Sequence, residues 1–333
     1  MSSNVRAVRA QLPGSPQNLV PGTTLSGKWK GKSYHIMERI GQGANGTVYL
    51  ASRDGELVAL KIAHDASALS IEHDNLIKLG VDARGRSIAP RALELDDLKL
   101  GTDTHPALAM EYVGGQTVAQ FILGHGSEWV PVVLVKILRL LGALHERGYI
   151  FGDLKPANLL INPTSVEPRL IDFGGVTTQG QAVKEFTEMF DRAWWGLGTR
   201  RAEPGYDLAA AALLSVHVLG LVDKTDVERL TSSRPAARQA WLVARLNEQR
   251  MQMPLIPILM KALQGVYPDT SSFVSEVIQL LEHNPIVASE IQAAQVTVPP
   301  KRARAHRPWD MTDWGLLIAI IVFTATLGLL IWI

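Results

Sequence analysis

The sequence predicts an α+β fold in two lobes, a small β-rich lobe followed by a large helical lobe, plus a single C-terminal transmembrane helix. Short runs with the alternation of β-strands occur between residues 33 and 113. Between residues 132 and 283, apolar residues recur at the three- and four-residue spacing of helices. Residues 314–333 then carry no charge over 20 positions. A strand-rich half followed by a helix-rich half predicts two lobes with a cleft between them.

The composition narrows the class of protein. With 47% hydrophobic and 20% charged residues, the 333-residue chain is not mainly disordered. The absence of cysteine excludes disulfide scaffolds, thiolate zinc sites, iron–sulfur clusters and cysteine nucleophiles. The 33 basic and 32 acidic residues give a net charge of +1, whereas a nucleic-acid-binding domain is usually basic. We therefore expect no nucleic-acid partner.

The elements of the folded body, residues 31–283, follow in order. Residues 1–30 are rich in Ser, Pro, Gly and Gln and predict a flexible arm. The small lobe should span residues 31–112, and its predicted strands are 33–40, 46–52, 56–63 and 107–113. The large lobe should span residues 116–283, and its predicted helices are 132–148, 206–221, 254–263 and 271–283.

The C-terminal segment predicts a membrane anchor. After a Pro-rich, basic linker over residues 284–312, residues 314–333 would form a helix ~30 Å long, the thickness of a bilayer's hydrocarbon core. The basic cluster at 301–307 should stay on the cytoplasmic side, which predicts a single-pass protein with a cytoplasmic body. A buried core helix is the alternative. Thr324 and Gly328 form a small-xxx-small pair that predicts at most a weak homodimer.

A glycine-rich segment, Gly41 to Val48 (GQGANGTV), lies between two β-like runs. Glycines allow a tight turn and let backbone N–H groups approach phosphate oxygens. A dinucleotide-binding fingerprint would need a helix after the glycines, but the following residues are strand-like. The segment therefore predicts a hairpin lid.

Two charged residues follow the lid. Lys61 lies near the end of the apolar run Val58–Ile62 and should point into the cleft, where it needs an anionic partner. Glu72 is the candidate partner, because Leu76 and Leu79 share its helix face. The alternative is that Glu72 is a surface acid.

The densest chemical signal is Gly152-Asp153-Leu154-Lys155-Pro156-Ala157-Asn158, followed by Asp172-Phe173-Gly174. Metal-assisted phosphoryl transfer needs oxygen ligands for Mg²⁺, a carboxylate near the attacking hydroxyl and a cation on the transferring group. Asn158 and Asp172 can supply the ligands, Asp153 the base and Lys155 the cation.

With these motifs in this order, residues 34–281 resemble a eukaryotic-type (Hanks-type) serine/threonine protein kinase. The resemblance implies the two-lobed protein-kinase-like fold, binding of ATP with Mg²⁺ (or Mn²⁺), and a protein substrate with a Ser or Thr acceptor. Lys155, two residues after Asp153, is the pattern of Ser/Thr kinases, and Thr187 takes the position of the threonine that contacts the catalytic loop. The residues that the resemblance assigns to ATP are Ile40, Gly41, Gly43, Gly46, Val48, Ala59, Lys61, Met110 (gatekeeper), Glu111 and Val113 (hinge), and Leu160.

The sequence departs from the family at several positions. Phe151-Gly152-Asp153 replaces His-Arg-Asp, so a phosphorylated activation loop lacks its usual arginine partner, although Phe151 can still stack on Phe173. The family's Ala-Pro-Glu aligns with residues 192–194 and loses its Glu, while the matching Arg aligns with Tyr267. We expect a contact of Trp194 with Tyr267 in place of that ion pair.

Two other functions stay open at this point. The departures favour a membrane-anchored pseudokinase that binds nucleotide as a scaffold, whereas retention of Lys61, Asp153, Asn158 and Asp172 favours an active enzyme. Gly152-Asp153 also resembles the His-Gly-Asp loop of small-molecule phosphotransferases that act on aminoglycosides. Thr177 and Thr178 are candidate autophosphorylation sites or ordinary loop residues.

Overall fold

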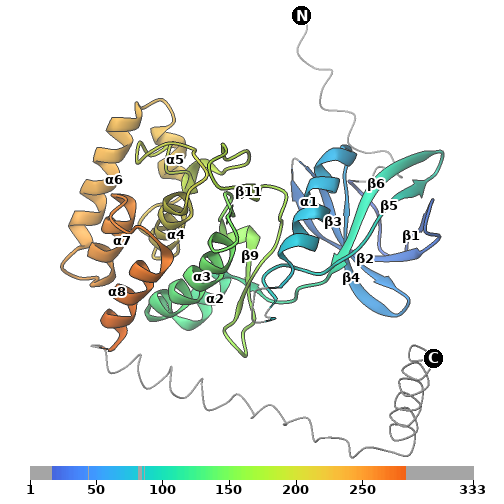
Figure 1. The fold of residues 1–333 in the computed structure, drawn as a ribbon, viewed down its shortest axis with the longest axis horizontal. Coiled ribbons are helices and arrows are strands. Elements are labelled where there is room, and N and C mark those ends of the chain that lie inside the picture. Colours follow the sequence, from blue (N-terminus) through green and yellow to red (C-terminus); the bar gives the residue numbers. More distant parts are fainter. Residues whose placement is uncertain (1–16, 44, 82–84, 86, 283–333) are drawn as a thin grey trace, which may run out of the picture. The chain divides into compact units, whose positions relative to one another are not determined.

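The structure is a computed structural model that describes residues 17–43, 45–81, 85 and 87–282. These residues fold into the two predicted lobes, a β-rich one and a helical one (Figure 1). The predicted linker 284–312 and transmembrane helix 314–333 lie outside the described residues. Among the helices of the described part, none has both the length and the apolar character needed to cross a membrane.

The small lobe is a closed antiparallel barrel. In the order in which they pair, its strands are β1 (Thr24–Gly27), β2 (Ser33–Gly43), β3 (Gly46–Arg53), β4 (Glu56–Ile62), β6 (Asp103–Glu111) and β5 (Ala92–Leu100). Four of them match the predicted strands, whereas β1 and β5 are additional. Strand β1 closes the barrel because it pairs with β2 on one side and β5 on the other.

The first strand lies within the segment that composition assigns to a flexible arm. Leu19 and Leu25 are buried in the barrel core with Tyr34 and Tyr49, and the Leu19 N–H donates to the Tyr49 hydroxyl at 3.1 Å. Burial of these two leucines holds the segment against the lobe. The lobe therefore begins at least twelve positions before residue 31, and residues 1–16 lie outside the described residues.

Helix α1 (Ala66–Leu79) carries Glu72 and packs on β5 and β6. The Asp65 carboxylate caps the helix by accepting the Ser67 N–H at 2.8 Å. Leu69, Leu76 and Leu79 are buried, and Glu72 shares their face at three- and four-residue spacing. This spacing explains why a charged side chain lies inside the molecule.

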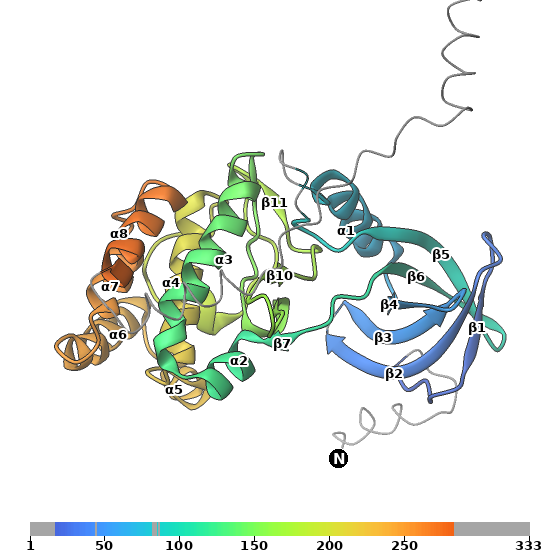
Figure 2. The ribbon, with the colours of Figure 1, turned by 90° about the horizontal axis from the view of Figure 1, so that it is seen from below.

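The two lobes are joined by a single extended connection that leads from β6 into β7 (Figure 2). The helices of the large lobe are α2 (Val118–His125), α3 (Val130–His145), α4 (Pro204–Val218), α5 (Lys224–Leu230), α6 (Pro235–Gln249), α7 (Leu255–Leu263) and α8 (Thr270–Glu282). Its short strands are β7 (Gln116–Thr117), β8 (Tyr149–Ile150), β9 (Leu159–Ile161), β10 (Pro168–Leu170) and β11 (Thr177–Thr178). Helices α3, α4, α7 and α8 confirm the predicted ones.

Helix α4 forms the centre of the large lobe. Residues 206–216 are all buried, which fits a segment that is apolar around most of its circumference. The helix packs against α3 and α7, while α8 packs against α3. This core supports the loops around β8, β9 and β10 that face the small lobe.

Candidate active site

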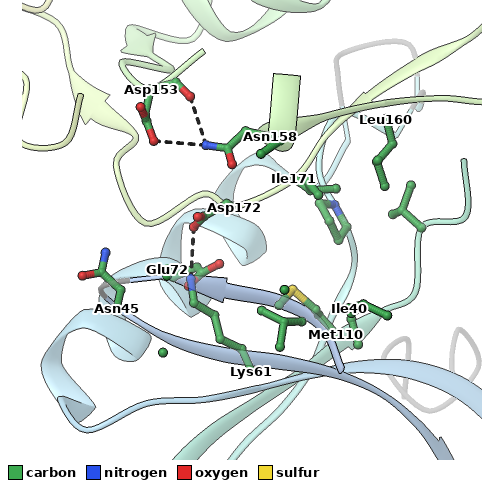
Figure 3. Close-up of a pocket in the computed structure, with 18 of the residues that line it drawn as sticks. Ile40, Asn45, Lys61, Glu72, Met110, Asp153, Asn158, Leu160, Ile171 and Asp172 are labelled. Atoms are coloured by element: carbon green, nitrogen blue, oxygen red, sulfur yellow. Dashed lines mark hydrogen bonds and ion pairs between the residues drawn. The ribbon is translucent and has the colours of Figure 1, made fainter. Parts of the chain in front are cut away.

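A cavity of about 630 Å³ lies between the lobes. Its wall is contributed by the glycine-rich hairpin, β4, the connection after β6 and the loops around β9 and β10 (Figure 3). All of the residues that the sequence assigns to ATP or to metal line it, and so do Lys61, Glu72, Asp153 and Lys155. Thr187 is not part of the wall but contacts Asp153 directly.

Apolar side chains cover one end of this cavity. Val48 and Ala59 come from the small lobe and Leu160 from the large lobe, while Met110 is buried at the back. Sequence analysis missed Ile171, which lies beside Leu160 and could have been identified because it directly precedes Asp172. Two apolar walls that face each other form a slot suited to a flat aromatic ring.

The connection between the lobes forms the edge of the slot. The Glu111 carboxylate is held by Arg169 at 3.2 Å and accepts the Arg91 N–H at 3.0 Å. The Glu111 N–H donates to the Arg91 carbonyl at 2.9 Å. The Glu111 side chain therefore fixes the connection between the lobes, and residues 111–113 line the cavity.

The glycine-rich segment is the predicted hairpin. Strands β2 and β3 pair from Gly41–Val48 to Gly43–Gly46, and the turn between them covers the polar end of the cavity. Gly46 has a φ of +143°, and a Cβ there would lie 2.5 Å from the Ile62 carbonyl oxygen. Only glycine allows the hairpin to lie this close to β4.

Lys61 bridges two carboxylates from different elements. Its amine donates to Glu72 Oε2 at 2.6 Å and to Asp172 Oδ1 at 3.0 Å (Figure 3). Glu72 and Lys61 are buried, so the predicted pairing is confirmed and the surface-acid alternative is wrong. Asp172 is 36% exposed and adopts a φ of +66°, a left-handed conformation that a non-glycine residue keeps only where the surroundings enforce it.

The charges of Lys61, Glu72 and Asp172 change the pKa values of their neighbours. Burial raises the pKa of Glu72 to about 7, although the Lys61 ammonium opposes the shift. Burial alone would lower the pKa of Lys61, but the Glu72 and Asp172 carboxylates outweigh burial and raise that pKa above its ordinary value. Lys61 therefore stays cationic at neutral pH, whereas burial makes Glu72 a weaker acid than an exposed glutamate.

The Asp153 carboxylate is oriented by three donors. Oδ1 accepts the Thr187 hydroxyl at 3.0 Å, while Oδ2 accepts Lys155 Nζ at 2.5 Å and Asn158 Nδ2 at 3.2 Å. Asn158 Nδ2 also donates to the Asp153 carbonyl at 3.0 Å. The Asn158 amide oxygen is thereby directed toward Asp172 (Figure 3).

The loop that carries Asp153 is anchored from below by Asp207 in α4. The fully buried Asp207 carboxylate accepts the N–H groups of Phe151 and Gly152 at 2.8 and 2.9 Å, and contacts His145 Nε2 at 2.8 Å. Sequence analysis did not identify His145 as part of this anchor. Phe151 packs edge-on against Phe173 with ring centroids 5.7 Å apart, as expected from the sequence.

The donor set near Asp172 suits a hard divalent cation. Asn158 and Asp172 offer oxygen atoms from two loops, the ligand type that Mg²⁺ prefers. Among the residues that the structure describes, no group of three or more His, Cys, Asp or Glu side chains could hold a metal ion. Two protein oxygens are appropriate for Mg²⁺ when phosphate oxygens and water complete its coordination.

Residues 184–186 also line the cavity, which the sequence analysis missed. The Asn45 side-chain amide, on the glycine-rich hairpin, donates to Glu185 Oε1 at 2.7 Å. The two residues are 140 positions apart, and Glu185, unlike Asn45 of the glycine-rich segment, belongs to no motif identified in the sequence. The cavity is thus bridged at its polar end by a contact between the lobes.

A sequence model of the protein kinase domain matches residues 34–196. This part of the chain is therefore similar to protein kinase domains. The fold of the chain also resembles that of vaccinia related kinase 3, with a TM-score of 0.58 and 15% sequence identity over 81% of this chain and 94% of that one. The described residues therefore share the protein-kinase-like fold.

Two curated relatives show how far the similarity extends. The serine/threonine-protein kinase YabT of Bacillus subtilis is 41% identical over 202 residues, which is 60% of each chain. The serine/threonine-protein kinase ArnS of Sulfolobus acidocaldarius is 24% identical over 335 residues, covering 84% of this chain and 53% of ArnS. The chain thus spans between about half and 60% of the length of these relatives.

The expected contact of Trp194 with Tyr267, in place of the family's Glu–Arg ion pair, is wrong. Among the residues that the structure describes, Trp194 packs edge-on against Trp195, and the Arg238 guanidinium lies 4.2 Å from the Trp194 ring centroid. Tyr267 stacks on Phe273 instead. Helix α6, which carries Arg238, is absent from the sequence prediction, so its role as the partner element could not be foreseen.

Proposed function

We propose that this chain is a serine/threonine protein kinase that transfers the γ-phosphoryl group of ATP to a Ser or Thr hydroxyl of a protein. The observation that carries the proposal is the convergence of Lys61, Asp153, Asn158 and Asp172 on one interlobe cavity whose other end is apolar. The names of the relatives YabT and ArnS support the acceptor class. Lys155 next to Asp153 supports it as well.

Each charged residue has a task that its contacts support. Asp153, fixed by Thr187 and Lys155, accepts or orients the proton of the acceptor hydroxyl. Lys61, held by Glu72, contacts the α- and β-phosphates, and Lys155 stabilises charge on the transferred group. Positioning and electrostatic stabilisation supply nearly all the rate enhancement in phosphoryl transfer.

Asn158 and Asp172 would hold Mg²⁺, or Mn²⁺, at the phosphate end of the cavity. The bound cation would neutralise charge on the phosphate oxygens. The protein's own contribution is to keep both ligands in place, since the Asn158 carbonyl accepts the Ile171 N–H at 2.9 Å and Asp172 pairs with Lys61. Apolar walls at the other end would enclose the adenine ring.

We also propose that residues 314–333 anchor the kinase in a membrane with the kinase domain on the cytoplasmic side. An uncharged run of 20 residues behind the basic cluster at 301–307 supports this. Thr324 and Gly328 would permit close packing of two such helices. Deleting residues 314–333 should move the protein to the soluble fraction, and unchanged membrane association would contradict the anchor.

One experiment tests the activity. The full chain in a mild detergent is mixed with labelled ATP, Mg²⁺ and a basic acceptor protein, next to the variants Asp153→Asn and Lys61→Met. Phosphate incorporation into Ser or Thr that both substitutions abolish supports the proposal. ATP binding without transfer would indicate a nucleotide-binding scaffold, and transfer only to aminoglycosides or sugars would indicate a small-molecule phosphotransferase.

A further inference from the structure

The segment from Asp172 to α4 carries Thr187, whose hydroxyl contacts Asp153, so the conformation of this segment affects the acceptor side of the site. In the kinase family that the sequence resembles, the position of Gly152 carries an arginine that can contact a phosphorylated loop, and glycine has no side chain to do so. Thr177 is buried, and its hydroxyl donates to the Gly175 carbonyl at 2.9 Å. Residues 179–186 contain no Ser or Thr, which leaves the exposed Thr178 as the accessible hydroxyl before Phe186.

Backbone pairing with the loop before α4 fixes the first half of this segment. The Gly180 N–H donates to the Ala202 carbonyl at 2.8 Å, and the Ala202 N–H donates to the Gln181 carbonyl at 2.7 Å. The Val183 N–H donates to the Arg200 carbonyl at 2.8 Å. The main chain of Arg200 is therefore hydrogen-bonded to this segment, independently of the Arg200 side chain.

The side chain of Arg200 is fixed by Asp191, whose carboxylate is completely buried. Arg200 donates to Asp191 Oδ2 through Nε at 2.8 Å, and its Nη2 lies 2.7 Å from the same oxygen. The carboxylate accepts three more hydrogen bonds, from the Tyr206 hydroxyl at 3.0 Å and from the N–H groups of Ala193 and Trp194 at 3.0 and 3.2 Å. A buried carboxylate with this many donors is a rigid support for a guanidinium group.

The same guanidinium contacts the acceptor side of the active site. Its central carbon lies 3.6 Å from the centroid of the Phe186 ring, a close cation–π stack. Phe186 lines the cavity and directly precedes Thr187, whose hydroxyl holds Asp153 Oδ1. A continuous series of contacts thus leads from Asp191 through Arg200 and Phe186 to Thr187 and Asp153.

We propose that Arg200, supported by Asp191, is a positioning residue that holds the acceptor side of the active site in its working conformation without a phosphate on the segment. The inference rests on the proposed kinase activity. The ion pair of Arg200 with the buried Asp191 takes the place of an arginine–phosphate pair that phosphorylation of the segment would create. Arg200 does not line the nucleotide cavity, so its loss should alter the transfer step and acceptor binding and leave ATP binding intact.

The test uses the full chain in detergent with four variants. Arg200→Ala removes both contacts, and Arg200→Lys keeps the charge but loses the planar stack and the two-pronged donation to Asp191. Arg201→Ala is the matched control, because its side chain is exposed. Thr178→Ala removes the accessible hydroxyl. Kinetics with a Ser/Thr acceptor are measured together with the Kd of a fluorescent ATP analogue.

We expect both Arg200 variants to lose at least about tenfold in kcat and to show a raised KM for the acceptor, with the Kd of the analogue within about twofold of wild type. Arg201→Ala, Thr178→Ala and phosphatase-treated wild type should keep wild-type rates. A Kd like that of wild type shows that a variant is folded. If Arg200→Ala does not fold, Arg200→Lys alone tests the inference.

Three results would overturn the inference. Folded Arg200 variants could show wild-type kinetics, or they could raise the Kd of the analogue by the same factor by which they lower kcat. The third result is wild-type activity that disappears on phosphatase treatment and returns on autophosphorylation. Absence of transfer by wild type itself would instead contradict the proposed kinase activity.

Discussion

The buried pair of Lys61 and Glu72 makes the stability of the two-lobed body depend on pH, and the substitution Lys61→Met tests this dependence. Burial raises the pKa of Glu72 from 4.5 to about 7. The folded state therefore binds a proton on Glu72 more tightly than the unfolded chain does, and this gain in stability is present in acid and lost as the pH rises from about 4.5 through 7. The difference corresponds to about 3 kcal/mol in the free energy of unfolding, and it is what remains after the Lys61 ammonium has opposed the effect of burial.

Substituting Lys61→Met removes that offset. At pH 8 the buried Glu72 carboxylate is left without its 2.6 Å partner, and we expect unfolding free energy to fall by about 3 kcal/mol, the range measured for broken buried pairs. At pH 5.5, below the raised pKa of Glu72, this carboxyl is mostly protonated in the wild type, so the loss should shrink to about 1 kcal/mol. The residual loss comes mainly from the partly exposed contact with Asp172.

The assay is urea unfolding of the full chain in detergent, followed by tryptophan fluorescence at both pH values. Lys136→Met is the control, because the Lys136–Glu167 pair is at the surface and should cost less than about 1 kcal/mol at either pH. An equal loss for Lys61→Met at pH 5.5 and pH 8, or a larger loss in acid, would refute the assignment of the raised pKa to Glu72.

Two further substitutions test the polar end of the cavity. Thr187→Val removes the hydroxyl that holds Asp153 and should lower kcat by about tenfold to a hundredfold in steady-state assays, whereas Thr187→Ser should stay within about threefold; equal losses would show that the hydroxyl is unimportant. Glu185→Gln removes a carboxylate beside the phosphate site and should lower the Kd for ATP, measured by titration, by about fivefold, since such repulsion is worth about 1 kcal/mol in a wet cleft. Glu188→Gln, an exposed neighbour, is its control, and unchanged or weaker ATP binding by Glu185→Gln would contradict the expectation.

The fold could be predicted where hydrophobic periodicity is strong. Helices α3 and α4 and strands β3 and β4 have regular apolar patterns, and the structure places them as expected. Strand β1 could not be recognised, because four residues within a Ser-, Pro- and Gly-rich segment carry too little pattern, and its pairing with both β2 and β5 is decided by tertiary contacts. Helix α6 was missed for a related reason, since only Leu242 and Leu246 of its side chains are buried.

The site could be predicted as far as its residues lie in short motifs. Asp153, Lys155, Asn158 and Asp172 are defined by spacing, and the sequence indicated their chemistry. Asp191 and Arg200 are nine positions apart without a recognisable pattern, and their importance follows from burial and from ring contacts that only coordinates reveal.

Strand β1 also has a bearing on how the small lobe behaves toward other chains. An open five-stranded sheet would present unpaired N–H and C=O groups along β2 and β5, which are templates for strand addition and aggregation. The four residues Thr24–Gly27 occupy part of both edges at once. A chain trimmed to residue 31, where the composition changes, would uncover these edges and remove Leu19 and Leu25 from the core. We expect such a trimmed protein to self-associate through its small lobe, while a chain that retains residues 17–30 stays dispersed.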